Sequence, residues 1–237
     1  MARIFLLLLT ILLVGCQAEL ATSTYQPTPT MTPLPPKLRY LALGDSYTIG
    51  ESVAVDERWP VQLVAALRGQ GIVIADPEIV AKTGWTTAEL AEGIAQAQPE
   101  GPYDLVSLLI GVNNQYRGLS EEQYREQFVG LLETAVTLAN NNPNRVFVVS
   151  IPDWGVTPFG QRRDFQEVSA AIDAFNAINQ EETESRGIIY IDITPISRQA
   201  PDDRSLIAND GLHPSGEMYR QWIELILPEA ERLLLQE

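Results

Sequence analysis

The chain has few of the residues that build disulfides and metal sites. Its 237 residues include one cysteine, Cys16, and one histidine, His213. A single cysteine excludes a disulfide within the chain, and this pair cannot supply the ligands of a zinc cluster. The glycines after the first predicted strand lack the spacing of a dinucleotide-binding or phosphate-binding loop. We therefore expect neither a metal nor a cofactor.

Positive charge is also scarce. The chain has 16 lysines and arginines against 31 aspartates and glutamates, which gives a formal net charge of −15 at pH 7. A polyanion of this kind repels phosphate backbones, so we exclude nucleic acid as a partner. The composition is otherwise close to the globular average, at 45% hydrophobic and 20% charged residues, which argues against wholesale disorder.

The N-terminus lacks a run long enough to span a membrane, but it has the pattern of an export signal. Arg3 precedes a nearly uninterrupted apolar stretch over residues 4–14, followed by Gly15 and Cys16. This order is typical of a signal peptide, whereas a membrane-spanning helix needs about 20 apolar residues. Residues 13–16, Leu-Val-Gly-Cys, resemble the bacterial lipobox, which implies cleavage before Cys16 and a lipid on its sulfur. The alternative is a stray thiol without function.

A segment rich in threonine and proline follows the predicted cleavage site. Residues 16–36 contain little that can form a core, and their prolines favour an extended polyproline II conformation. We predict a signal peptide over residues 1–15, a lipidated tether over 16–36 and a folded domain over 37–237. The protein is then an exported lipoprotein of the cell envelope, held on the membrane by the lipid on Cys16, with its domain outside the cytoplasm. A loosely packed arm is the alternative reading of the tether.

Strand and helix patterns alternate along residues 37–237. Short apolar runs, typical of strands buried on both faces, cover residues 38–43, 103–110, 145–150 and 188–192. Residues 72–80 are a weaker candidate because Asp76 and Pro77 interrupt them, so we expect a short and bulged strand there. The alternation predicts an α/β fold with a parallel sheet covered by helices on both faces. In such folds the functional residues gather at the carboxyl ends of the strands.

The helices between these strands carry recognisable start and stop signals. Thr86 with Glu89, and Ser120 with Gln123, have the capping-box spacing at which a side chain satisfies a backbone donor of the first turn. Pro228 lies in the last helical pattern and predicts a kink or an end there.

Residues suited to nucleophilic catalysis stand next to the predicted strands. Ser46 follows the first strand in the sequence Gly-Asp-Ser, and Asp210 and His213 precede the last helix. A serine hydroxyl is a poor nucleophile unless an imidazole accepts its proton and a carboxylate orients that imidazole. His213 is the only imidazole available, and a short loop can turn Asp210 back toward it.

These motifs, in this order, resemble the SGNH or GDSL hydrolase superfamily, and in particular bacterial GDSL-type esterases and lipases. The resemblance runs from about Arg39 to the last helix. It implies that Ser46 is the nucleophile, that Asp210 and His213 are the acid and the base, and that Gly84 and Asn113 complete an oxyanion hole with the Ser46 N–H. It also implies a flavodoxin-like, three-layer α/β/α fold with a mainly parallel sheet of about five strands.

One position departs from the family pattern, and others nearby have two readings. The family usually has aspartate where this chain has Asn114, which affects the support of that loop and makes Asn114 a candidate for substrate contact. Arg117 can clamp an anionic substrate or be a solvated side chain. Trp154 and Phe159 can line an acyl pocket or close the edge of the sheet.

The function predicted from these residues is hydrolysis of carboxylic esters through an acyl-enzyme, with a small ester or an acylated glycan as substrate. One alternative is an inactive surface lipoprotein that binds glycans or a protein partner in the same cleft. Another keeps the triad but acts as a polysaccharide O-deacetylase or a thioesterase.

Overall fold

The computed structural model describes residues 37–236. The predicted signal peptide, the lipidation site at Cys16 and the tether lie outside the described residues and stay predictions. Within residues 37–236, no helix combines the length and the hydropathy needed to cross a bilayer.

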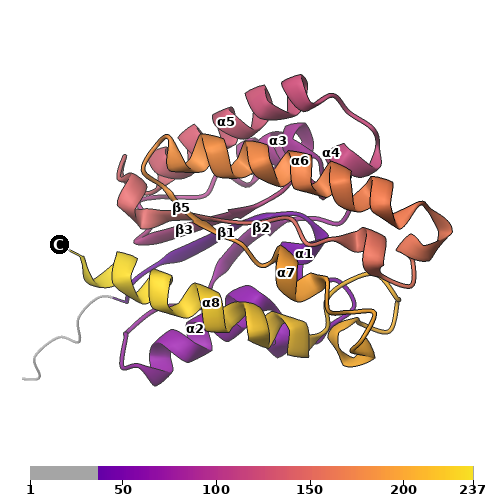
Figure 1. The fold of residues 1–237 in the computed structure, drawn as a ribbon. Coiled ribbons are helices and arrows are strands. Elements are labelled where there is room, and N and C mark those ends of the chain that lie inside the picture. The colour runs from indigo at the N-terminus through magenta and orange to yellow at the C-terminus, as the bar shows by residue number, and fades with distance from the viewer. Residues whose placement is uncertain (1–36, 237) are drawn as a thin grey trace, which may run out of the picture. The chain divides into compact units, whose positions relative to one another are not determined.

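Five parallel strands form one sheet in the order β2-β1-β3-β4-β5 (Figure 1). This is the flavodoxin-like order, in which strands are first added on one side of β1 and then, from β3 onward, on its other side. The predicted fold class is therefore confirmed. The strands are β1 (Tyr40–Gly44), β2 (Glu78–Ala81), β3 (Leu105–Leu109), β4 (Val146–Val149) and β5 (Ile189–Ile191).

Helices cover both faces of this sheet. Figure 1 shows α3, α5 and α6 on one face and α2 and α8 on the other. The longer helices are α2 (Trp59–Gly69), α3 (Thr87–Ala97), α5 (Glu121–Leu138), α6 (Phe165–Glu184) and α8 (Gly216–Leu235). Short helices stand at the carboxyl side of the strands, namely α1 (Ser46–Ile49), α4 (Val112–Tyr116) and α7 (Thr194–Ser197). Single 3-10 turns are η1 (Val55–Glu57), η2 (Pro143–Arg145), η3 (Trp154–Val156), η4 (Gly160–Arg162) and η5 (Arg204–Leu206).

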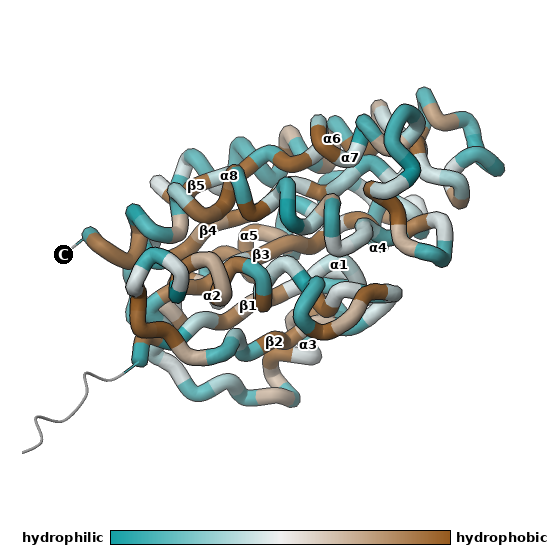
Figure 2. Tube along the Cα trace, turned by 90° about the horizontal axis from the view of Figure 1, so that it is seen from below, coloured by the Kyte–Doolittle hydropathy of each residue, from teal (hydrophilic) through white to brown (hydrophobic). Residues whose placement is uncertain are grey.

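The core lies along the central strands. Every residue of β1, β3 and β4 is buried, because each of these strands has a neighbour on both sides and helices above and below. Figure 2 shows the hydrophobic residues concentrated on these strands. Burial on both faces explains why the strands appear in the sequence as continuous apolar runs.

The edge strand β2 is short, as predicted, and an irregularity precedes it. A parallel bridge joins Leu38 to Ile74, while Leu41 pairs with Glu78. The segment from Ile74 to Glu78 is thus one residue longer than the segment it faces, and the extra residue falls around Asp76 and Pro77. The predicted bulge is confirmed, and it occurs at an edge where proline costs the sheet least.

Two helix-end predictions have different outcomes. The Thr86 side chain caps α3, and the Glu89 carboxylate accepts the Thr86 N–H in return, so the capping box is complete. Pro228, for which a kink or an end was predicted, does not end α8, which continues to Leu235; the kink stays a prediction. Because Ala230 and Leu233 are buried beyond the proline, their packing outweighs the one backbone hydrogen bond that proline removes.

Candidate active site

The turn after β1 presents Ser46 at the carboxyl edge of the sheet. Asp45 caps α1 by accepting the Tyr47 N–H at 3.0 Å, which makes Ser46 the first residue of this short helix. The turn packs tightly against its surroundings: a Cβ atom on Gly44 would lie 2.1 Å from Thr48 Oγ1 and 2.5 Å from the Leu109 carbonyl oxygen. Only glycine fits there, so the position of the serine is closely defined.

The carboxyl group of Asp45 lies behind this turn and is fully buried. Burial raises the pKa of Asp45 to about 7, since its hydrogen bonds with the backbone N–H groups of Tyr47 and of Asp45 itself do not replace the lost hydration. Asp45 does not line the cavity described below, so its role is to shape the turn.

Ser46, His213 and Asp210 form a continuous hydrogen-bonded line. His213 Nε2 lies 3.0 Å from Ser46 Oγ, and His213 Nδ1 lies 2.5 Å from Asp210 Oδ2. Ser46 and His213 are both more than nine-tenths buried. The structure therefore brings together three residues from two segments that are 167 positions apart in the chain.

The loop from Asp210 to His213 is closed by its own hydrogen bonds. Asp210 Oδ1 accepts the N–H groups of Leu212 at 2.9 Å and His213 at 3.0 Å. Gly211 has a φ of +74°, a left-handed conformation that glycine adopts without strain. The three-residue spacing thus turns the carboxylate back toward the imidazole.

A residue that the sequence did not indicate also contacts this carboxylate. Ser52 Oγ donates to Asp210 Oδ2 at 2.7 Å, and Ser52 has a φ of +66°, which is uncommon for a residue other than glycine. Partial burial opposes ionisation of Asp210, but the hydrogen bonds from His213, the Leu212 N–H and Ser52 outweigh it. They hold the pKa of Asp210 well below its usual value, so Asp210 is ionised at neutral pH.

Gly84 and Asn113 face the same cavity as the serine. Gly84 has a φ of +84° in the loop between β2 and α3, and Asn113 is in α4, directly after β3. The Asn113 amide donates to the Trp85 carbonyl oxygen at 2.9 Å, which fixes its orientation. With Ser46 and His213 they line a cavity of ≈190 Å³. A backbone N–H and a carboxamide at such a position can stabilise an oxyanion.

Asn114 does not contact this cavity, so the expectation that it binds substrate is wrong. Its side chain is fully buried, and it accepts the Thr87 N–H at 3.0 Å and donates to Thr87 Oγ1 at 2.7 Å. The amide accepts the first bond and donates the second, which leaves the Thr87 hydroxyl free to donate to Gln127 Oε1; a carboxylate could only accept, so it would compete with Gln127 for that hydroxyl. Asn114 therefore attaches the start of α3 to α4.

Arg117 is not a free clamp for an anion, because its guanidinium is already engaged although its side chain is half exposed. Its guanidinium donates to the Gly84 carbonyl oxygen at 2.5 Å and forms an ion pair with Glu89 at 3.2 Å. Because Glu89 already compensates its charge, Arg117 has little attraction left for an anionic substrate. Its contact with Gly84 makes it a brace of the loop that carries this predicted oxyanion donor.

Trp154 and Phe159 line the catalytic cavity together with Tyr116, which the sequence analysis did not single out. The rings of Tyr116 and Trp154 lie 5.3 Å apart and those of Trp154 and Phe159 lie 6.0 Å apart. Tyr116 stands three residues after Asn113 in α4, so its position on the same helical face was the signal that could have revealed it. Among residues 37–236, no group of histidine, cysteine, aspartate and glutamate side chains is arranged to hold a metal ion.

Solved structures of hydrolases share this fold. The structure of TesA has a TM-score of 0.65 and 18% identity, with 83% of this chain and 99% of that chain covered. AlinE4, an SGNH-hydrolase family esterase, has a TM-score of 0.58 and 22% identity, with 86% and 100% covered. The psychrotrophic esterase EstA from Pseudoalteromonas sp., in a structure inhibited by monoethylphosphonate, has a TM-score of 0.60 and 16% identity, with 84% and 99% covered.

A search of curated proteins gave no match. The sequence profile of the GDSL-like lipase/acylhydrolase family, in contrast, matches residues 42–221, which is most of the chain. That match spans every residue of the site described above. The chain therefore belongs to the GDSL-like lipase/acylhydrolase family and is a serine hydrolase of the SGNH type.

Proposed function

We propose that this protein hydrolyses carboxylic esters through an acyl-enzyme formed on Ser46. The observation that carries the proposal is the line of hydrogen bonds from Asp210 through His213 to Ser46, which ends at the wall of the catalytic cavity. An inactive glycan-binding or partner-binding protein would need the cavity but not this line. The geometry therefore favours catalysis over the binding alternative.

In the first half of the reaction, His213 Nε2 accepts the proton of Ser46 Oγ as the oxygen attacks the ester carbonyl. The negative charge that develops on the carbonyl oxygen is stabilised by the N–H groups of Ser46 and Gly84 and by the Asn113 amide. Asp210 holds the ring in the tautomer that leaves Nε2 free, and it stabilises the imidazolium. His213 then gives the proton to the departing alcohol, and the acyl group stays on Ser46.

In the second half, a water molecule takes the place of the alcohol. His213 accepts its proton while the water oxygen attacks the acyl carbon, and the same donors hold the second oxyanion. Collapse of this intermediate breaks the bond to Ser46 Oγ, which recovers its proton from His213. The products are a carboxylic acid and the free enzyme.

The dimensions of the cavity favour short acyl groups. Its ≈190 Å³ are below the roughly 300–1,000 Å³ of cavities that hold drug-sized ligands, and its walls include the aromatic rings of Tyr47, Tyr116, Trp154 and Phe159. An acetyl or butyryl group fits such a space, whereas a long fatty chain does not.

The proposal is tested by reacting the full-length protein with a fluorophosphonate and locating the label by peptide mass spectrometry. We expect a single label on Ser46, together with hydrolysis of p-nitrophenyl acetate and little hydrolysis of p-nitrophenyl palmitate. Ser46→Ala is expected to lose both the label and the activity, by at least about 10⁴-fold in kcat. Ser205→Ala, which changes an exposed serine far along the chain, is the matched control and is expected to keep both. Labelling of Ser46→Ala at another residue would overturn the assignment.

A further inference from the structure

The turn that follows α1 contacts two other loops of the site through consecutive side chains. The Glu51 carboxylate accepts a hydrogen bond from the Thr83 hydroxyl, and Ser52 Oγ donates to Asp210 Oδ2 at 2.7 Å. Thr83 immediately precedes Gly84 in the loop between β2 and α3, whereas Asp210 belongs to the loop before α8. We call residues 50–52 the linking turn, because its partners lie 32 and 158 positions away in the chain.

The backbone of the linking turn is attached to the nucleophile itself. The N–H groups of Gly50 and Glu51 both donate to the carbonyl oxygen of Ser46, the second at 3.0 Å. Gly50 and Ser52 have φ values of +68° and +66°, so the chain is left-handed on either side of Glu51. This conformation is uncommon for serine, and such positions concentrate at functional sites. The contacts to both loops thus start from the backbone that holds the attacking hydroxyl.

The contact of Glu51 lies next to the predicted oxyanion donor. Thr83 lines the catalytic cavity beside Gly84, and the predicted donor is the N–H of the peptide that joins these two residues. Gly84 has no side chain that could anchor it, and Arg117 contacts only its carbonyl group. Holding the Thr83 side chain therefore limits how far this N–H can turn away from the cavity.

The contact of Ser52 lies on the other half of the site. Asp210 Oδ2, which accepts the Ser52 hydroxyl, is the same oxygen that contacts His213 Nδ1. Its second oxygen is used within its own loop, where it accepts two backbone N–H groups. Among the contacts of Asp210 described here, that of Ser52 is the one that joins this carboxylate to the segment of the nucleophile.

We infer that Glu51 and Ser52 are positioning residues, which set the oxyanion loop and the acid of the triad relative to Ser46. The inference rests on the function proposed above and adds to it two residues that do not line the catalytic cavity. Since Thr83 and Ser52 are exposed, each bond contributes modestly, and the expected effects on rate are small.

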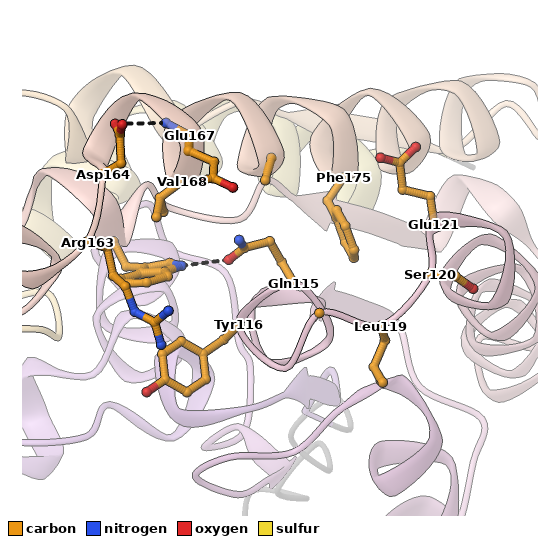
Figure 3. A pocket seen from close by; sticks show the side chains of 13 residues that line it. Gln115, Tyr116, Leu119, Ser120, Glu121, Arg163, Asp164, Glu167, Val168 and Phe175 are labelled. Carbon is orange, nitrogen blue, oxygen red and sulfur yellow. Dashed lines mark hydrogen bonds between the residues drawn. The ribbon is translucent and has the colours of Figure 1, made fainter.

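The aromatic wall of the catalytic cavity has a separate attachment. Tyr116 and Trp154 line both this cavity and a second one of ≈570 Å³, shown in Figure 3. The Trp154 indole N–H donates to Gln115 Oε1 at 2.8 Å, a bond that Figure 3 shows as a dashed line reaching Gln115. Neither partner of this bond belongs to the linking turn. Loss of the Glu51 contact should therefore lower the rates for p-nitrophenyl acetate and p-nitrophenyl butyrate by the same factor.

A double-mutant cycle tests the contact between Glu51 and Thr83. For full-length Glu51→Ala we expect kcat for p-nitrophenyl acetate to fall about three- to fivefold, with KM within about twofold. Thr83→Val should cause a similar loss, and the double variant should lose no more than either single variant, because all three lack the same bond. Glu51→Gln keeps an acceptor and should recover most of the rate. Losses that multiply in the double variant, or a changed ratio of the acetate and butyrate rates in Glu51→Ala, would overturn the role of Glu51.

Glu57→Ala is the matched control. It removes an exposed carboxylate that accepts the Ala54 N–H at 3.0 Å within its own turn and does not line the cavity. Its kcat is expected to stay within about twofold of that of the unmodified protein. A loss equal to that of Glu51→Ala would show that the whole segment loosens, which contradicts the inference.

Hydrogen exchange followed by mass spectrometry tests both contacts without catalysis. Glu51→Ala should speed exchange of the backbone amides of residues 83–87 about two- to tenfold, and Ser52→Ala should do the same for residues 211–213. Each variant should leave the other segment unchanged, and Glu57→Ala should change neither. This pattern in a protein without esterase activity or a label on Ser46 would support the two contacts while removing the proposed reaction. An active protein whose Glu51→Ala and Ser52→Ala variants match Glu57→Ala in rate and in exchange would overturn the positioning role alone.

Discussion

The two sides of the catalytic cavity are built in different ways. On the side of the triad, Ser46, His213 and Asp210 contact each other directly, and the reacting groups form their own support. On the oxyanion side, Gly84 and Asn113 do not support one another. They are held by neighbours outside the reaction, chiefly the Arg117 side chain and the Trp85 carbonyl group.

This difference predicts a graded response to mutation. A change in the triad removes a reacting group at once, whereas a change among the supports of the oxyanion loop only loosens a donor that is still present. The Arg117 and Asn114 contacts converge on one short loop from Gly84 to Thr87. In the proposed mechanism, stabilisation of the oxyanion thus depends on how rigidly this loop is attached to α4.

The largest effect on the oxyanion side is expected for Asn113 itself. Asn113→Ala should lower kcat for p-nitrophenyl acetate by roughly 10² to 10³, since this is the usual loss when one oxyanion donor is removed. Asn113→Asp keeps the shape but removes the N–H donor, so it should lose at least as much. KM is expected to change little in both variants. A loss below about threefold in kcat would exclude Asn113 from the oxyanion hole.

A smaller effect is expected for the brace. Arg117→Met should lower kcat by roughly tenfold or less, because a charged hydrogen bond contributes ~1.5–3 kcal/mol when buried and less for a side chain that is half exposed. Arg117→Lys should recover part of the loss. The rate of labelling of Ser46 by a fluorophosphonate should fall in parallel with kcat, since it forms a similar oxyanion.

Arg68→Met is the matched control for this experiment. Arg68 also bonds a backbone carbonyl, that of Ile74, and pairs with Asp76, but it lies outside the site. If both variants lose activity to the same extent, Arg117 acts through general stability and not through Gly84.

The smallest effect is expected on the triad side, for Ser52. Ser52→Ala removes one of several hydrogen bonds to Asp210 and should lower kcat/KM only about two- to fivefold. The same bond lowers the pKa of Asp210 in the folded protein below its value in the unfolded chain. The ionised carboxylate therefore stabilises the folded state at any pH above its ordinary titration range. This stabilisation is lost as the pH falls toward the pKa of the folded state. Without Ser52 that contribution shrinks, and acid unfolding below about pH 4 should begin at a higher pH.

Circular dichroism between pH 2 and pH 5 measures this shift. Ser205→Ala serves as the control, because the Ser205 hydroxyl makes a comparable bond to Asp203 and does not line the catalytic cavity. A shift of the unfolding midpoint to lower pH in Ser52→Ala would contradict the assigned effect on Asp210.

Much of the fold could be predicted because local patterns carried the information. The central strands are buried on both faces, so each of them shows a continuous apolar run, and Asp76 with Pro77 marked the irregular edge strand. Whether α8 ends at Pro228 or continues through it could not be decided in the same way. Packing partners far away in the sequence stabilise that segment, and a local pattern does not reveal them.

In the candidate site, too, some features followed from the sequence and others only from the tertiary structure. By itself, the sequence determined which chemical groups are available: a serine after a buried strand, a single imidazole with a carboxylate three residues before it, and a glycine and an asparagine at two other strand ends. Only the tertiary structure decided which partners these groups have. Asn114 is buried against Thr87, and Arg117 braces Gly84. Ser52 contacts Asp210 from 158 positions away, and a second cavity shares Tyr116 and Trp154 with the catalytic cavity. The physical reason is that a residue type sets what a side chain can donate, accept or attack, whereas its partner is set by the register of the sheet and the packing of helices from distant parts of the chain.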